Sequence, residues 1–214
     1  MEISAETLIA HQLAYTYLGK AFYESPTLEL IQAIVADNLF ADWPLECANS
    51  EANAGLQQLV DFSAQWDDSQ FGEVRRDYAR LFIGPNRLLA PPWESVYRSS
   101  DHILFERQTL EVRRQYQRYQ MPLQRTHVEP EDHIGLELRF VAHLSGLALF
   151  ALERGDAALR SEAQNALAQF LSEHLLQWSP EFVERVLISA NTAYYRGIAQ
   201  LTLGCLYYTA SSPS

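Results

Sequence analysis

The chain has 214 residues, 48% of them hydrophobic, and a formal net charge of -11 that arises from 27 acidic and 16 basic residues. A chain of this length and composition can bury a substantial core, which excludes general disorder. The negative charge argues against nucleic acid and anionic membrane surfaces as partners and favours a cationic peptide.

Helix signals recur along the first half of the chain, and the alternation typical of strands is nearly absent. Small polar residues precede apolar residues spaced three or four apart, a pattern that predicts helices. Helix starts are predicted at Ser4, at Ser25 and Pro26, at Ser50, at Ser69 and at Asp101. Gly84 and Pro85 end the fourth of these helices, because glycine accepts a left-handed closing conformation and proline cannot continue the hydrogen-bond ladder.

Residues 84–97, GPNRLLAPPWESVY, interrupt this pattern with three prolines and cannot form a regular helix. The segment nevertheless carries leucines, a valine, a tryptophan and a tyrosine. A loop this apolar either folds back to fill the core or lines a groove for an apolar ligand. The residues alone leave both alternatives open.

Residues 120–131, QMPLQRTHVEPE, contain two prolines and no helical period, and they are predicted to form a linker. Beyond it, helices are predicted to begin at Asp132, at Asp156, at Ser179 and Pro180, and at Asn191. The predicted fold is all-α, a bundle of about nine helices in two packed halves joined by a hinge. The two halves are residues 1–119, which include the apolar loop, and residues 132–214.

The two cysteines and the N-terminus bear on the compartment. Cys47 and Cys205 lie far apart in sequence and belong to no zinc-binding pattern, which indicates two buried, reduced thiols rather than a disulfide framework. Glu2 and Glu6 stand where a secretion signal would carry positive charge, so we expect a cytoplasmic protein. The most apolar segment, residues 134–152, is interrupted by charged side chains, and no transmembrane helix is predicted.

Residues 129–137, EPEDHIGLE, concentrate four carboxylates and a histidine ahead of that apolar segment. One explanation is structural: Pro130 keeps the residue before it extended, and Asp132 accepts hydrogen bonds from the first amides of a helix. The same carboxylates complement the positive end of the helix dipole. This explanation leaves His133 and Glu137 without a role, because neither is needed for a cap.

Catalysis would have to depend on the same stretch. No nucleophile elbow, phosphate-binding glycine loop, His-Glu-x-x-His pattern or paired-cysteine site occurs in the chain. His133 and Glu137 are four residues apart, so on a helix they share a face and could provide two metal ligands. A third ligand is not evident. A metal-dependent hydrolase that uses these two residues is kept as an alternative.

The stretch EPEDHIG, in a linker between helical halves, resembles the motif of the TorD/DmsD family of redox-enzyme maturation chaperones. Other stretches support the likeness: YLGKAFYESP near the start, DWPLE, YARLFIGP followed by PPWESVY, HLLQWSPEFVERV and YYRGIAQLT. The resemblance covers most of the chain. It is closer to the dimethyl sulfoxide reductase branch than to the trimethylamine N-oxide reductase branch.

The resemblance implies an all-helical cytoplasmic chaperone and not an enzyme, with no cofactor of its own. Such chaperones bind the twin-arginine leader of a molybdoenzyme catalytic subunit and delay export until the molybdopterin cofactor is inserted. The residues agree with this role, because a leader that carries guanidinium groups beside an apolar run requires carboxylates next to an apolar groove.

By position, the resemblance places the leader-binding residues at Tyr23, Leu81, Phe82, Pro92, Trp93, Asp132 and His133. It implies that Asp132 contacts an arginine or orders the hinge, that His133 makes a hydrogen bond at the cleft, and that the apolar residues contact the hydrophobic run. Supporting acids would be Glu129, Glu131 and Glu137. The tyrosine, leucine and phenylalanine would serve core packing equally well, whereas a tryptophan among prolines is typical of a recognition anchor.

A guanine-nucleotide-responsive helical adapter is a further alternative, since guanine nucleotide binding has been proposed for this family. The chain has no Gly-x-x-x-x-Gly-Lys-Ser/Thr loop to support it. The linker makes domain swapping feasible, so a monomer and a swapped dimer are both compatible with the sequence.

Overall fold

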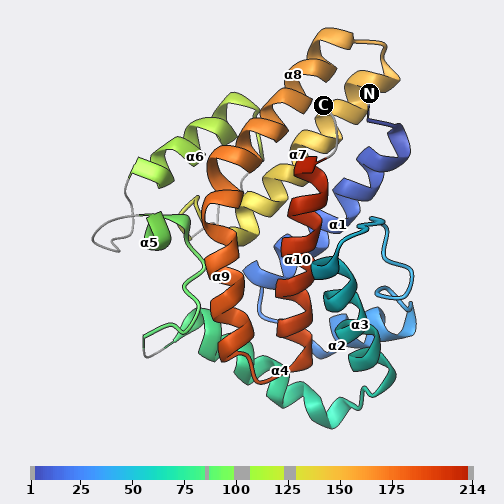
Figure 1. The fold of residues 1–214 in the computed structure, drawn as a ribbon, viewed down its shortest axis with the longest axis vertical. Coiled ribbons are helices and arrows are strands. Elements are labelled where there is room, and N and C mark those ends of the chain that lie inside the picture. The colour runs from blue at the N-terminus through green and yellow to red at the C-terminus, as the bar shows by residue number, and fades with distance from the viewer. Residues whose placement is uncertain (1–2, 85–86, 99–106, 123–128, 212–214) are drawn as a thin grey trace. The chain divides into compact units, whose positions relative to one another are not determined.

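The computed structural model describes residues 3–84, 87–98, 107–122 and 129–211 (Figure 1). Among these residues no β-strand occurs, and helices follow one another along the chain. The prediction of an all-α fold is confirmed.

The α-helices are α1 (Ala5–Tyr23), α2 (Leu28–Ala36), α3 (Ser50–Ala64), α4 (Phe71–Tyr78), α5 (Glu94–Arg98), α6 (Arg107–Arg118), α7 (Ile134–Glu153), α8 (Ala157–Phe170), α9 (Leu176–Ser189) and α10 (Ala193–Ser211). A 3-10 turn, η1 (Asp68–Gln70), precedes α4. Two π turns, η2 (Ala79–Ile83) and η3 (Leu171–Leu175), follow α4 and α8. Each π turn widens the helix locally and changes which side chains face the core.

Three predicted helix ends are confirmed by the residues at those ends. Ser4 accepts a hydrogen bond from the Thr7 amide at 3.1 Å, and Asp156 accepts one from the Leu159 amide at 3.0 Å. Gly84 ends the helix that runs through η2, with the left-handed φ of 91° that favours glycine. These ends depend on local chemistry, which a sequence displays directly.

Some starts lie near the predicted positions but not at them. Thr27, rather than Ser25 and Pro26, caps α2, because its hydroxyl accepts the Leu30 amide at 3.2 Å. The predicted start at Ser69 falls inside the 3-10 turn η1, which Asp67 caps. The start predicted at Asp101 lies outside the described residues.

The helix start predicted at Ser179 and Pro180 is wrong. Helical backbone continues through α8, η3 and α9, and Pro180 lies inside α9. Proline removes one hydrogen bond from the helix, but Trp178 and Phe182, on either side of it, are almost fully buried. Burial of these two large side chains outweighs the lost hydrogen bond.

Two compact units make up the chain. Unit 1 comprises Met1–Tyr23, Pro92–Ser179 and Ala210–Ser214, and unit 2 comprises Glu24–Pro91 and Pro180–Thr209. This grouping differs from a division at residues 120–131, because the N-terminal helix packs with residues beyond the linker. The division into halves at that linker stays a prediction.

Helix α7 forms the centre of unit 1, with α1 and α8 packed on it. Its contact with α1 is close, since a Cβ atom at Gly135 would lie 2.7 Å from the carbonyl oxygen of Gly19. Among the described helices α7 alone is long and apolar enough to cross a membrane, and 67% of its most apolar window is buried inside the protein. That burial is typical of a core helix.

In unit 2, α3 packs against α10 at small residues. A Cβ atom at Gly204 would meet the Ala52 backbone nitrogen at 2.2 Å, so the two helices approach within backbone contact. Buried Asp77 accepts hydrogen bonds from the amides of Asn191 and Thr192 at 3.0 and 2.8 Å. The predicted start at Asn191 is therefore correct to within two residues, and the carboxylate that stabilises it comes from α4.

Candidate functional site

Two stretches that the sequence singles out lie side by side in unit 1. The Glu94 amide donates to the Asp132 carbonyl at 3.0 Å, and the Ile134 amide donates to the Pro92 carbonyl at 2.8 Å. These two bonds form an isolated antiparallel bridge between Trp93 and His133. The end of the apolar loop is thereby attached to the start of α7.

An aromatic cluster surrounds this bridge. The His133 ring lies 5.1 Å from the Tyr23 ring and 6.2 Å from the Trp93 ring, both edge to face. Tyr23 and Trp93 are half-buried, whereas Pro92 and His133 are buried. Four of the predicted binding residues thus gather in one place, and Trp93 and Tyr23 are the two with exposed surface. Part of the apolar loop is buried and part of it, including Leu89, is exposed.

His133, and not Asp132, caps α7. Its ring Nδ1 accepts a hydrogen bond from the Gly135 amide at 3.0 Å. The assignment of the cap to Asp132 is wrong, and so is the inference that His133 is not needed for a cap. Because Nδ1 accepts a hydrogen bond from an amide, this nitrogen carries no proton, and the ring holds its proton on Nε2.

Asp132 is fully buried and orders the loops around it. Its carboxylate accepts hydrogen bonds from the Ser95 amide at 2.9 Å and from the Thr109 hydroxyl at 2.8 Å. It thereby connects the starts of α5, α6 and α7. Of the two roles that the resemblance implies for Asp132, this geometry supports the ordering of the segment before α7.

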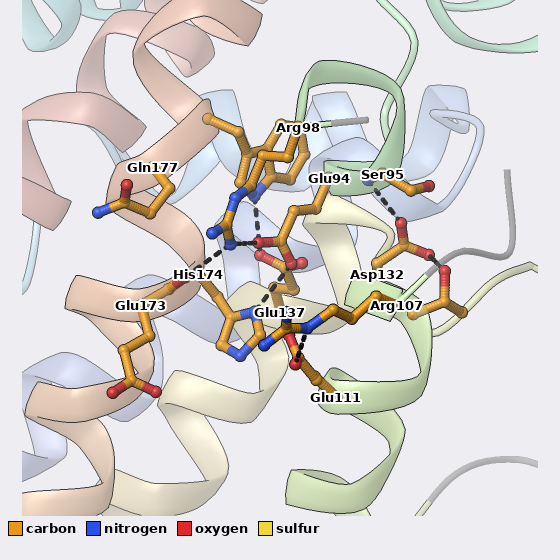
Figure 2. A network of polar contacts seen from close by, with 12 residues as sticks. Glu94, Ser95, Arg98, Arg107, Glu111, Asp132, Glu137, Glu173, His174 and Gln177 are labelled. Atoms are coloured by element: carbon orange, nitrogen blue, oxygen red, sulfur yellow. Dashed lines mark hydrogen bonds and ion pairs between the residues drawn. The ribbon is translucent and has the colours of Figure 1, made fainter. Parts of the chain in front are cut away.

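A second carboxylate, Glu94, lies at the centre of a polar network (Figure 2). It is fully buried, forms an ion pair with Arg98, and lies 2.9 Å from the Nδ1 atom of His174. Arg98 also donates to the carbonyl of Glu173 at 2.7 Å. The π turn η3 carries both His174 and Glu173, so the widened turn anchors the start of α5, directly after Trp93.

Glu137 is a third buried carboxyl in this region, and it is held neutral. Burial, followed by the charges of Glu94 and Asp132, raises its pKa well above 4.5. The indole N–H of Trp178 donates to Glu137 at 3.1 Å, and the carboxyl also forms a hydrogen bond with Glu94. A proton between two buried carboxyls removes the repulsion that two charges would create.

A ligand pair of His133 and Glu137 is not assembled. His133 uses Nδ1 as a helix cap, and Glu137 contacts Trp178 and Glu94. Within residues 3–84, 87–98, 107–122 and 129–211, no group of three or more His, Cys, Asp or Glu side chains is arranged to hold a metal ion.

We expect Glu137→Gln to stabilise the protein at neutral pH. The folded state of the wild type holds a proton at Glu137 that the unfolded chain releases above about pH 4.5. The contribution of this group is therefore fully present below that pH and is lost as the pH rises toward the folded-state pKa. Glutamine can keep both hydrogen bonds without a proton to lose. Near pH 7 the gain should be on the order of 1 kcal/mol or more.

Urea denaturation of wild type and Glu137→Gln between pH 5 and pH 8 tests this expectation. All other groups, including His11, whose burial lowers its pKa to about 4, titrate in both proteins and cancel in the difference. The stability difference should grow with pH. A difference that does not change with pH would contradict the neutral state assigned to Glu137.

The remaining predicted residues have other surroundings. Leu81 and Phe82 belong to the core of unit 2, where Phe82 packs on the rings of Tyr78, Phe182 and Tyr195. Their burial agrees with core packing, which the sequence allows as readily as leader binding. Glu131 accepts two hydrogen bonds from Arg113, at 2.6 and 2.9 Å, and Glu129 is half-buried.

Sequence reasoning missed Glu94, His174 and Trp178. Glu94 and His174 are 80 residues apart, and Glu137 and Trp178 are 41 residues apart, so no local pattern connects either pair. Glu94 lies within the PPWESVY stretch, directly after the predicted anchor Trp93. His174 and Trp178 likewise lie within the stretch HLLQWSPEFVERV, so the signals for these residues came from the family resemblance.

The sequence of this chain is similar to those of known proteins. Residues 45–184 match the family model of the nitrate reductase delta subunit. The Tat proofreading chaperone DmsD of Salmonella typhi is 30% identical over 86% of this chain and 81% of the relative. The chaperone protein YcdY of Escherichia coli is 33% identical over 86% and 85%, and the chaperone protein TorD of Vibrio cholerae is 31% identical over 71% and 68%.

A solved structure has the same fold. A candidate redox enzyme maturation protein from Archaeoglobus fulgidus superposes with a TM-score of 0.54 over 90% of this chain and 92% of the other. At 15% sequence identity, this likeness concerns the fold alone.

Proposed function

The chain belongs to the nitrate reductase delta subunit family, and on that basis we propose that it binds the twin-arginine signal peptide of a molybdoenzyme catalytic subunit in the cytoplasm. The client would be of the dimethyl sulfoxide reductase type, and binding would delay its export until molybdopterin is inserted. The relatives are chaperones rather than enzymes, in agreement with the expected class.

The bridge between Trp93 and His133 is the observation that supports this proposal most. It presents a half-buried tryptophan beside Tyr23 on a loop that buried carboxylates hold in place. Large aromatic side chains on a rigid support are effective peptide anchors, because little conformational entropy is lost on binding. Among the described residues the Trp93 indole N–H is buried and has no hydrogen-bond partner, so the exposed part of the ring would contact a peptide through its apolar surface.

The net charge of -11 adds a long-range attraction for a cationic leader. Because Asp132 and Glu137 are buried and already hydrogen-bonded, we assign the attraction for the arginines to the acidic surface as a whole. We assign the apolar run of the leader to the half-buried rings of Trp93 and Tyr23, both in unit 1.

Calorimetric titration with synthetic twin-arginine leaders tests this function. We expect micromolar or tighter binding to one leader, weaker binding at physiological salt than at low salt, and loss of binding when both leader arginines are replaced by glutamine. The arginine-to-glutamine leader is the matched control, since it keeps the apolar run. Absence of binding to every leader of the candidate reductases would contradict the proposal.

The same preparation tests the alternatives. Titration with guanine nucleotides should give no heat of binding, and metal analysis of protein purified without added ions should find substoichiometric metal. Size-exclusion chromatography separates a monomer from the dimer that swapping across residues 120–131 would give.

A further inference from the structure

The two cysteines of the chain are neighbours in unit 2. The Sγ atoms of Cys47 and Cys205 lie 3.6 Å apart, although the residues are 158 positions apart in sequence. Both side chains are thiols rather than halves of a disulfide, and both are buried. The expected burial of both cysteines is confirmed. No sequence pattern indicated that they touch.

Three further contacts hold the two thiols at this separation. The Asn49 side chain, two residues after Cys47, donates to the carbonyl of Gly204 at 2.9 Å. Gly204 in turn lies against the backbone of Ala52 in the first turn of α3. The Trp43 indole, four residues before Cys47, lies against the Cys205 sulfur. The backbone on both sides is thus fixed, so the thiols cannot drift apart without disrupting these contacts.

We propose that Cys47 and Cys205 form a reversible disulfide when the protein meets a hydroperoxide. In a reducing cytoplasm the pair would rest as thiols, and a disulfide there would be transient and redox-sensing rather than structural. This inference does not depend on the proposed leader binding, because it concerns unit 2 alone.

The reaction has two steps. Deprotonated Cys47 attacks the terminal oxygen of the hydroperoxide and becomes a sulfenic acid, while the O–O bond breaks and an alcohol, or water from hydrogen peroxide, leaves. The Cys205 sulfur then attacks the Cys47 sulfur, the S–S bond forms, and the hydroxyl leaves as water with the Cys205 proton. The two sulfurs together lose two electrons, and the peroxide gains them.

The surroundings assign these roles. Cys47 lies in the segment between α2 and α3, whereas Cys205 lies inside α10 and is fully buried. The hydrogen bond between the two thiols, together with burial, raises the pKa of Cys205, so its thiolate forms less readily. Cys47 is therefore the thiol that meets the oxidant, and Cys205 is the one that resolves the sulfenic acid.

The disulfide would tie the segment before α3 to α10 and so restrict the unfolded chain across a long loop. We expect the melting temperature to rise by about 5 °C or more on oxidation and to return with dithiothreitol. Intact mass measured after denaturation in an alkylating agent should show the loss of two hydrogens and no alkylated cysteine.

Cys47→Ser and Cys205→Ser are the matched controls. Neither should form the internal bond or gain thermal stability, and Cys205→Ser should accumulate a sulfenic acid at Cys47 that dimedone traps. Oxidation is repeated in urea below the unfolding transition, so that slow opening cannot hide the reaction. Two alkylatable cysteines in the treated wild type, or added oxygen mass in place of lost hydrogen, would overturn the proposal.

Discussion

Glu94→Ala is expected to lower the free energy of unfolding by about 3 kcal/mol, because it removes the buried carboxylate that contacts both the Arg98 guanidinium and the His174 ring. His174 is 5% exposed and would lose its partner without access to water, whereas Arg98 is 31% exposed and can be rehydrated. The estimate therefore lies at the lower end of the losses seen when a buried ion pair is broken. The change also removes the contact with His174 that holds the start of α5, directly after Trp93, against the η3 turn.

A matched control for this change is available in the next helix. Glu111 and Arg107 form another ion pair at four-residue spacing, but their side chains are 33% and 84% exposed. Removal of an exposed pair costs little, since both groups are hydrated before and after. Urea denaturation should therefore show a large loss for Glu94→Ala and no measurable change for Glu111→Ala. Equal effects of the two substitutions would mean that the buried network does not stabilise unit 1.

The helices themselves are largely predictable because their signals are local. Ser4, Asp156 and Gly84 act within one turn of their own positions, and the sequence shows each of them beside an apolar period. The π turns are not predictable in this way. They follow from tertiary packing, and the one at residues 171–175 places His174 against Glu94, which no period indicates.

The roles of Asp132 and His133 show where local reasoning ends. Both residue types can stand at a helix start, and aspartate is the stronger cap by preference. Asp132 instead accepts hydrogen bonds from Ser95 and Thr109, which are 37 and 23 residues away in sequence. His133 therefore caps the helix. A sequence shows which residues can cap, but the choice between adjacent candidates depends on distant donors.

The association of the Trp93 loop with the start of α7 was predictable only through the family resemblance. Composition gave an apolar loop and an acidic stretch, and it left open whether the loop filled the core. The hydrogen bonds from Glu94 and Ile134 across to Asp132 and Pro92 are backbone contacts, and side-chain identity does not encode them.

Trp93→Ala should weaken leader binding about 30-fold or more while the helical fold remains. The Trp93 ring is half-buried and contacts His133 edge to face, so truncation removes a partly exposed aromatic ring at the bridge but leaves both bridge hydrogen bonds in place. Binding energy is lost because an apolar leader segment has no ring to cover. The buried network beneath, from Asp132 to Ser95, does not involve the indole.

Trp66→Ala is the matched control for the same truncation. Trp66 is also half-buried, its indole donates to Asp68 at 3.0 Å, and its ring lies 5.2 Å from Phe62, all within unit 2. Titration with the leader that binds the wild type should show a large loss for Trp93→Ala and none for Trp66→Ala, with circular dichroism unchanged in both. Normal binding by a folded Trp93→Ala variant would refute the site while leaving the chaperone function intact, because the wild type would still bind the leader at another surface.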